Sequence, residues 1–264
     1  MLEDFTIFLW LLKIGALINL YFLANTFVMP HRATDAHLLV PAQILFAVSA
    51  YRCLFPVEYK GNAVFHDSPL SSIFATRLLA TFSEVAYIYQ FSYVIRLLNA
   101  DHTGWVNVLS WVMVLQVVIS QCFVWGAILS GRLMLYFYEE LGWAIILAAN
   151  TIASAFLYLT LHSLGRAGIL IYLNLLFGLL YLPWQFIHLR VQLSDAKRSG
   201  DTGRLGTPLT WQLLREGLKR SIRVRNRTSD ASAWGRWVGL TWMAGYWATL
   251  IPMWVNQVVV VFSR

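Results

Sequence analysis

The chain alternates long apolar runs with short polar segments, and seven of the apolar runs are long enough to cross a membrane. A transmembrane helix needs about 20 mainly apolar residues, because the hydrocarbon layer is about 30 Å thick. The pattern therefore predicts an all-α fold, an integral membrane bundle of seven transmembrane helices that forms a single transmembrane domain over residues 1–264. The predicted spans are residues 5–29, 38–55, 71–98, 106–130, 141–164, 169–193 and 238–262.

The distribution of Lys and Arg predicts the orientation of these spans. Cytoplasmic loops of membrane proteins carry an excess of both residues. With seven spans, the N-terminus shares one side with Arg52, Lys60, Arg132 and the basic stretch of residues 190–236. The opposite side carries only Arg32, Arg96, Arg166 and Arg264. We therefore expect the N-terminus and the loop of residues 194–237 in the cytoplasm, and the C-terminus outside or in a lumen.

The loop of residues 194–237 is the one sizeable polar segment of the sequence. Thr207 and Pro208 predict a helix N-cap and a first helical position. Apolar residues then recur on one helix face, at Trp211, Leu214, Leu218 and Ile222. The basic residues beside this face are Arg215, Lys219, Arg220 and Arg223. The pattern predicts a basic amphipathic helix in the plane of the headgroups, which binds anionic lipids or a membrane-protein partner, or serves as a plain anchor.

Composition agrees with a membrane location and favours one class of binding partner. Hydrophobic residues make up 58% of the chain and charged residues 12%, with a mean hydropathy of +0.60; soluble domains are roughly 45–50% apolar and about 25% charged. The net charge of +7 is concentrated in one loop between spans, so we expect anionic lipid and not nucleic acid as its partner. Two cysteines, Cys53 and Cys122, are too few for a disulfide framework or a four-cysteine metal site.

The most informative single residue is Glu84, in the third predicted span. At a rise of 1.5 Å per residue it lies about 20 Å from each end of that span, near the bilayer midplane. An acidic residue at this depth costs at least ~2.5 kcal/mol and is expected to face the bundle interior. A carboxyl group in such a site suits general acid work or proton relay, with a hydrogen-bonded structural acid as the alternative.

Arg77 precedes Glu84 by seven residues and shares its helix face. Two helical turns separate the Cα atoms by roughly 10 Å, which predicts contact through a substrate or water and not directly. The alternative for Arg77 is a side chain that reaches toward the cytoplasmic headgroups.

Other polar residues are expected to form the rim and lining of a cavity on the same side. Glu139 and Glu140 come just before the fifth predicted span, where acids also suit the positive end of a helix dipole. Gln185 and His188 follow Pro183, which is expected to kink the sixth span. The remaining candidates are His66 and Asp67 in the loop before the third span, and the deeper Gln116, Gln121 and Asn150. Each deeper residue also suits an interhelical hydrogen bond.

Metal, haem and nucleotide chemistry find little support in the sequence. His66, Asp67, Glu139, Glu140 and His188 are ligand types without a metal-site spacing, and His31, Asp35 and His37 form only a loose cluster. Haem needs facing axial histidines, and His162 and His188 lie near opposite ends of their spans. No Walker loop, dinucleotide turn, nucleophile elbow or retinal-type lysine occurs, so we predict no metal and no cofactor.

Three functions remain open. The first is a membrane-embedded enzyme that acts on an apolar lipid or isoprenoid-like substrate. Glu84 would be the acid/base, Arg77 would bind an anionic headgroup or orient Glu84, and His188 and Glu140 would assist at the cavity mouth. The second is a proton- or ion-coupled transporter or channel that uses Glu84, although no inverted repeat or pair of broken helices is seen. The third is a non-catalytic subunit of a larger membrane complex. Trp242, Trp247 and Trp254, inside the last span, suit either bulk packing or an apolar pocket.

Overall fold

Helices form most of the protein, and six of them are long and apolar enough to cross a membrane. The computed structural model describes residues 3–28, 35–99, 101, 103–160, 165, 168–201 and 208–263. Within these ranges the six helical segments are α1 (Thr6–Val28), α2 (Ala36–Leu54), α4 (Gly104–Ser130), α5 (Leu133–Thr160), α6 (Gly168–Arg198) and Arg236–Phe262. Large apolar side chains such as Ile7, Leu159 and Leu179 are exposed on their outer faces. This is the pattern of a multi-pass membrane protein, whose outer surface contacts lipid tails.

The third predicted span is a helix, α3 (Ile73–Leu98), but it is not among these six. It carries Arg77, Glu84 and Arg96, and most of its polar side chains are buried against other helices. The six-helix count therefore falls one short of the predicted seven, because this helix is the least apolar of the predicted spans.

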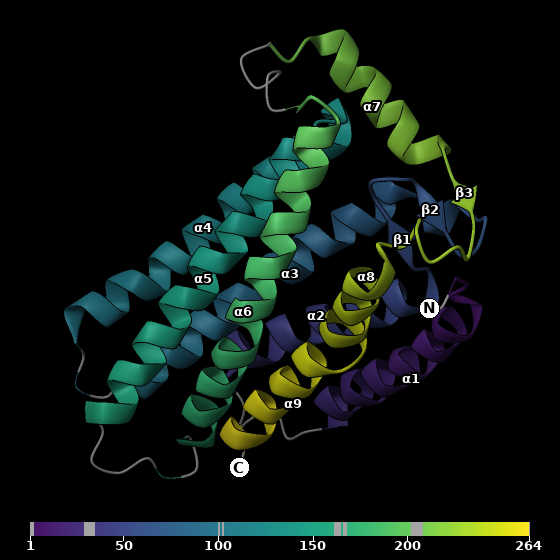
Figure 1. Cartoon of the computed structure of the whole chain (residues 1–264). Helices are drawn as coiled ribbons and strands as arrows, with labels where there is room; N and C mark the ends of the chain where they lie inside the picture. The colour runs from purple at the N-terminus through teal and green to yellow at the C-terminus, as the bar shows by residue number, and fades with distance from the viewer. Residues whose placement is uncertain are drawn as a thin grey trace.

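The helices follow one another around the bundle. Helices α1 to α6 pack as sequential neighbours, and the C-terminal segment closes the bundle against α1 and α2 (Figure 1). This segment contacts α6 much less extensively than it contacts α2. The main apolar core runs through the middle of the bundle and includes Leu45, Phe91, Ile146 and Val255.

The C-terminal segment is an interrupted helix. It consists of α8 (Arg236–Trp242), the single π-helical stretch η3 (Met243–Ala248) and α9 (Leu250–Phe262). Thr249 breaks the helix with φ −130° and ψ −82°. Stretches of π-helix are rare and frequently lie at functional sites. Tyr246 and Trp247 lie within the π-helical stretch, and Trp242 directly precedes it.

Two helix starts differ from the prediction by more than two residues. Helix α5 begins at Leu133 and not near residue 141, because Gly131, with φ +72°, ends α4 in the left-handed region and turns the chain at once. Glu139 and Glu140 are therefore inside the helix, and their predicted place before it is wrong. Helix α7 (Trp211–Arg223) begins three residues later than predicted, because the Thr210 hydroxyl caps it by accepting from the Leu213 N–H. Thr207 lies outside the described residues.

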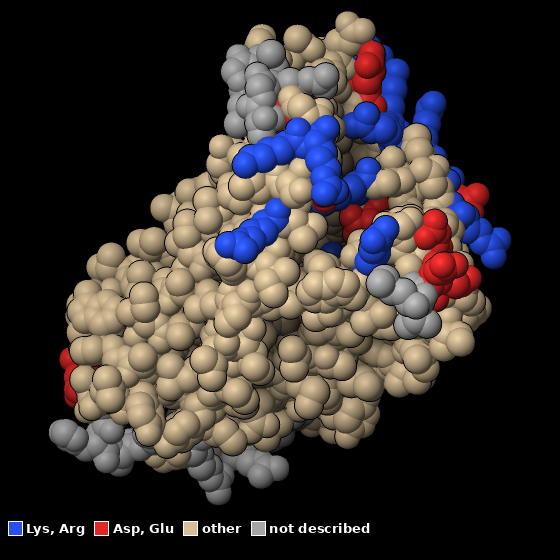
Figure 2. All heavy atoms as spheres, viewed as in Figure 1, with Lys and Arg blue, Asp and Glu red and all other residues tan. Residues whose placement is uncertain are grey.

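A small polar cap covers one end of the bundle, and we define it as residues 3–5, 57–64 and 226–231. Strand β1 (Val57–Glu58) pairs antiparallel with β2 (Ala63–Val64), which pairs parallel with β3 (Asn226–Arg227). Asp4 forms a bridge with Asp230, so the N-terminal segment joins the same cap. The 3-10 turn η1 (Pro69–Ser71) then leads into α3. Lys and Arg gather around this end of the molecule (Figure 2).

Candidate functional site

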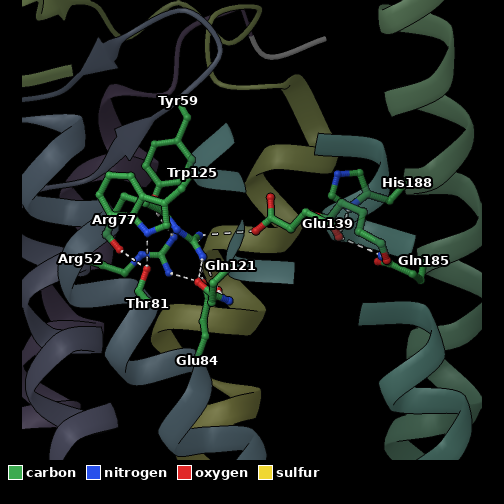
Figure 3. A network of polar contacts seen from close by, with 11 residues as sticks. Arg52, Tyr59, Arg77, Thr81, Glu84, Gln121, Trp125, Glu139, Gln185 and His188 are labelled. Carbon is green, nitrogen blue, oxygen red and sulfur yellow. Dashed lines mark hydrogen bonds and ion pairs between the residues drawn. The ribbon is translucent and has the colours of Figure 1, made fainter. Parts of the chain in front are cut away.

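A buried network of charges joins α2, α3, α4 and α5 beneath the polar cap. Arg77 Nη2 lies 2.7 Å from Glu84 Oε2, and Arg77 Nη1 lies 3.5 Å from Glu139 Oε1. Arg52 Nη1 reaches Glu84 Oε1 from α2 at 3.5 Å. Gln121 on α4 accepts a hydrogen bond from Arg77 and donates to Glu84 at 3.1 Å (Figure 3). Glu84 is thus contacted from three helices.

The geometry of α3 explains the direct contact between Arg77 and Glu84. Helix side chains lean toward the N-terminus, so the Glu84 carboxylate points back toward Arg77. Ala80, which is fully buried on the same face, leaves room between them. The prediction that a substrate or water bridges the pair is therefore wrong, because the two side chains meet without a bridge. Thr81 fixes the neighbouring turn by donating to the Arg77 carbonyl at 3.0 Å and accepting from Trp125 Nε1.

Burial makes the ion pairs of this network mutually dependent. Arg77 is 2% exposed and Glu84 4% exposed. A buried charge is tolerated only when it is paired and hydrogen-bonded, and removing one partner typically costs about 3–5 kcal/mol. Glu84 lies eleven residues after Ile73, or about 16 Å along the helix, and its side chain leans toward the polar cap. The Glu84 backbone thus lies close to the middle of α3, and its carboxylate joins the network on the side of the polar cap.

The polar cap supplies the upper wall of the network. Arg52 Nη2 donates to the Tyr59 hydroxyl at 3.4 Å, and the Arg77 guanidinium lies 6.0 Å from the centre of the Tyr59 ring. Burial raises the pKa of the Tyr59 hydroxyl and that of the Glu58 carboxyl. The charges of Arg52 and His188 act on Glu58 and partly oppose this effect. The cap thus closes the network from the basic end of the molecule.

A second polar group lies beside the first, between α5 and α6. Gln185 Nε2 donates to the Glu140 backbone carbonyl and to Glu140 Oε2, both at 2.8 Å. His188 Nδ1 lies 3.7 Å from the same Oε2, and His188 Nε2 lies 2.8 Å from Gln192 Nε2. Figure 3 shows Glu139 between this group and the arginines. The structure therefore brings together seven of the predicted candidates, namely Arg77, Glu84, Gln121, Glu139, Glu140, Gln185 and His188.

Aromatic rings connect the His188 group to the C-terminal segment. The His188 ring lies 4.9 Å from the Trp184 ring. Trp184 stacks on Trp242 with ring centres 5.4 Å apart, and Trp242 stacks on Tyr246 at 4.8 Å. The other end of this row meets Arg52, whose guanidinium lies 5.7 Å from the centre of the Tyr246 ring and 4.3 Å from that of Trp247. Tyr246 and Trp247 belong to the π-helical stretch η3, Trp242 ends α8, and Trp184 lies in α6.

An apolar pocket of about 520 Å³ lies between α6 and the C-terminal segment, beneath this aromatic row. Its lining is mostly apolar, and exposed residues such as Leu176, Leu180 and Met253 lie at its mouth, on the apolar outer surface. Its aromatic residues are Tyr87, Trp143, Phe177, Tyr181, Trp184, Trp242, Tyr246 and Trp254. The volume falls in the range of ligand pockets.

Several polar atoms in the lining of this pocket lack a hydrogen bond. They are the hydroxyls of Tyr87, Tyr181 and Tyr246 and Nε1 of Trp184, each buried and without a partner in the part of the chain that the structure describes. Buried polar atoms are nearly always hydrogen-bonded, so four such atoms around one pocket indicate a ligand or ordered water.

The remaining cavity candidates lie elsewhere. Asp67 pairs with Arg225 at 2.8 Å on the surface, and the ring of His66 packs among Trp10, Phe55 and Phe65. The pKa of His66 is lowered by partial burial and by nearby Lys13 and Arg227. Neither residue joins the charge network. Gln116 faces Gly142 between α4 and α5, and Asn150 is buried in α5, where neither side-chain polar atom has a partner among the described residues.

The basic residues of α7 lie on its exposed surface. Arg215, Lys219, Arg220 and Arg223 are all exposed, and Arg220 also donates to the Ile128 carbonyl at 3.3 Å, near the end of α4. A cation there suits the negative end of a helix dipole. Gly217 and Ser221 face the bundle, and Trp211 is left 79% exposed.

Arg52 is the residue that sequence reasoning missed. It lies in the last turn of α2, where it resembles an ordinary loop charge. An arginine inside the final turn of an apolar helix, opposite a helix with a buried acid, was the available signal. Tyr59, Tyr181, Trp184 and Tyr246 were missed as well, because aromatic residues are common throughout this sequence.

No group of three His, Cys, Asp or Glu side chains among the described residues is arranged to hold a metal ion. His31 and His162, which entered the metal and haem considerations, lie outside the described residues.

No protein-family model, curated protein or solved structure matches this chain. Its function must therefore be inferred from the chemistry of the site.

Proposed function

We propose that the chain crosses the membrane seven times, with α3 as the additional span. α3 is 26 residues long, enough to cross the bilayer, and its neighbours α2 and α4 bury its charged residues from lipid. The concentration of Lys and Arg around the polar cap supports a cytoplasmic location for that end (Figure 2). Arg215, Lys219 and Arg223 then contact anionic headgroups, while exposed Trp211 enters the interface.

We further propose a membrane-embedded enzyme that acts on an apolar lipid or isoprenoid-like substrate by proton transfer. The observation that supports this most strongly is the apolar pocket, which is open toward the lipid-facing surface, has tyrosine hydroxyls without a described partner in its wall, and meets the His188 ring through Trp184. A substrate tail occupies the apolar part, and its reacting end meets Tyr181 and Tyr246.

In this proposal Glu140 and His188 form the acid/base pair. Glu140 has no Lys or Arg partner among the described residues, and the His188 Nδ1 atom beside it is unpaired. A proton passes from this pair, through Tyr181, to one carbon of a substrate double bond, and the C=C π bond breaks. A proton lost from a neighbouring carbon to the pair forms a new double bond. Protons and electrons balance in this rearrangement without a co-reactant.

The proposed role of Glu84 changes from proton transfer to positioning. Its carboxylate is held by Arg77, Arg52 and Gln121, whereas no Lys or Arg among the described residues pairs with Glu140. We propose that Glu84 fixes the positions of Arg77 and Arg52. Arg77 then positions Glu139, and Arg52 positions the η3 rings that it contacts.

The test is conversion of lipids extracted from the membranes that contain the protein. Purified wild type and Glu140→Gln are incubated with the extract, and products are followed by mass spectrometry. We expect conversion by wild type and a loss of about 100-fold or more in Glu140→Gln, the usual size of a general acid–base contribution. The matched control is Glu216→Gln on the exposed face of α7. Equal conversion by Glu140→Gln would remove the pair from the mechanism, and ion flux in proteoliposomes without conversion would favour a transporter.

A further inference from the structure

The pocket between α6 and the C-terminal segment is a groove that follows α6 for much of its length. Its lining on α6 begins at Ile169 and ends at Trp184, a length of about 22 Å at 1.5 Å per residue. The Trp184 end lies toward the polar cap, because Asp195, further along α6, pairs with Lys60 of the cap at 2.7 Å. Spread over this length, the volume gives a mean cross-section of about 24 Å², well below the roughly 80 Å² of a helix about 10 Å across. The groove therefore suits one extended lipid chain and is too narrow for a partner helix.

The lining of the groove carries no charge. Among the described residues that form it, none is an Asp, Glu, Lys, Arg or His. An ion buried there would lose its hydration without gaining a partner of opposite charge, which costs far more than burying a hydrogen-bonded neutral group. Trp184, Trp242 and Tyr246 also stack on one another, and the Arg52 guanidinium lies 5.7 Å from the centre of the Tyr246 ring, so ring faces that could attract a cation are already occupied. We therefore expect a neutral occupant.

Two neighbouring side chains at the cap end of the groove define what the polar end of this occupant must offer. The Tyr181 and Trp184 rings lie 6.0 Å apart, and the Tyr181 hydroxyl and Trp184 Nε1 are buried without a partner among the described residues. The indole N–H can only donate a hydrogen bond, and the tyrosine hydroxyl can donate one as well. A ligand that satisfies Trp184 must therefore present an acceptor. A carbonyl oxygen accepts two hydrogen bonds and brings no hydrogen that needs a partner of its own.

We infer that the groove binds an uncharged single-chain lipid that ends in a carbonyl group. The carbonyl oxygen accepts hydrogen bonds from Trp184 and Tyr181, and the chain runs along α6 toward Ile169. An extended chain advances about 1.25 Å per C–C bond, so a lipid of about 18 carbons fills the groove. This inference rests on the proposed lipid pocket and specifies its substrate class, with Tyr181 in contact with the reacting end.

The experiment compares five probes with the same chain of about 18 carbons, brominated at the far end. They are a methyl ketone, an alcohol, an alkane, a quaternary ammonium ion and a sulfonate. Binding to the purified full chain in phosphatidylcholine nanodiscs is measured by bromine quenching of tryptophan fluorescence. We expect the ketone to bind about 20-fold more tightly than the alkane, which is about fivefold for each of two hydrogen bonds, and more tightly than the alcohol and both ions.

Three variants separate the carbonyl contact from general packing. Trp184→Phe keeps an aromatic ring and removes the donor, so it should reduce the preference for ketone over alkane about fivefold. Trp237→Phe, at an exposed position of α8 outside the groove, should leave this preference unchanged. Gly245→Leu adds a side chain to a lining position where a Cβ meets only Leu250 Cδ1, at 3.6 Å, so it should weaken binding of all five probes.

The direction of the chain is tested by photolabelling. Ketone probes with a diazirine beside the carbonyl should label residues 181–184, and probes with a diazirine at the far chain end should label residues 169–173, as mapped by mass spectrometry of the peptides. Labelling in the reverse order would overturn the proposed orientation.

The outcomes distinguish this inference from the proposed function. Alkane or alcohol binding as tight as ketone binding would overturn the carbonyl and leave the lipid pocket intact. Tight binding of either ion would overturn the neutral occupant. Failure of all five probes to bind wild type would overturn the lipid pocket, and the proposed function with it.

Discussion

At the scale of single residues, charges in an apolar bundle are stabilised only by one another. Glu84 receives Arg77 from its own helix, Arg52 from α2 and Gln121 from α4, and all four side chains are buried. Each of these side chains can therefore stay buried only while its partners are present. A carboxylate surrounded in this way is a poor proton donor and an effective structural centre.

Glu84→Gln should consequently destabilise the protein. The substitution leaves two buried guanidiniums short of a carboxylate, so the free energy of unfolding should fall by about 3 kcal/mol or more. Thermal unfolding in detergent measures this change, with Glu216→Gln expected within about 0.5 kcal/mol of wild type. Wild-type stability in Glu84→Gln would show that the network does not hold the fold.

Substitution of the pocket tyrosines should instead leave stability unchanged and reduce lipid conversion. The hydroxyls of Tyr181 and Tyr246 have no partner in the described chain, so Tyr181→Phe and Tyr246→Phe remove no hydrogen bond. Stability should stay within about 0.5 kcal/mol of wild type, while lipid conversion falls about tenfold or more, because a donor to the reacting group is lost. Tyr172→Phe, on the exposed side of α6, is the matched control. A large loss of stability with unchanged conversion would assign the hydroxyls to packing.

At the scale of elements, helix α7 is held by a close approach of backbones. A Cβ at residue 217 would fall on the Leu129 carbonyl at the end of α4, and the Arg220 side chain donates to Ile128 next to it. Only glycine allows this contact. The contact directs Trp211 and the exposed basic residues away from the bundle.

Gly217→Ala should loosen α7, because the added methyl group cannot fit against the α4 backbone. Trypsin should then cut after Arg215 and Lys219 several-fold faster than in wild type, as followed by mass spectrometry of the fragments. Gly61→Ala is the matched control, since a Cβ there meets nothing within 4 Å. Identical cleavage rates in Gly217→Ala and wild type would mean that α7 is not docked in solution.

The elements were largely predictable from sequence, and their contacts were not. Apolar periodicity located the helices, and an acid inside an apolar run identified Glu84. The early start of α5 depended on the backbone conformation of Gly131, and the break at Thr249 has no signal in hydropathy. Arg52 and Tyr246 joined the site through packing between distant segments, which residue spacing along one helix does not encode.

At the scale of the whole molecule, the number of crossings depends on α3. Six described helical segments have the length and hydropathy of a membrane span, and α3 is not among them. Helix α3 is less apolar because it carries buried ion pairs such as Arg77–Glu84. If α3 crosses the membrane, the loops at its two ends lie on opposite sides.

Cysteine labelling decides this point. In a Cys53→Ala, Cys122→Ala background, Gly61→Cys and Asp101→Cys should react with a membrane-impermeant thiol reagent from opposite sides of sealed vesicles. Arg215→Cys on α7 should label from the same side as residue 61. Labelling of residues 61 and 101 from one side would reduce the count to six crossings.

The central claim is that the pocket between α6 and the C-terminal segment holds an apolar ligand. The most direct measurement is mass spectrometry of the lipid that remains bound to the purified protein, wild type against Gly245→Leu. The account predicts one apolar species retained at about one per chain by wild type and lost from Gly245→Leu. Equal retention by both proteins, or no specific species in either, would contradict it.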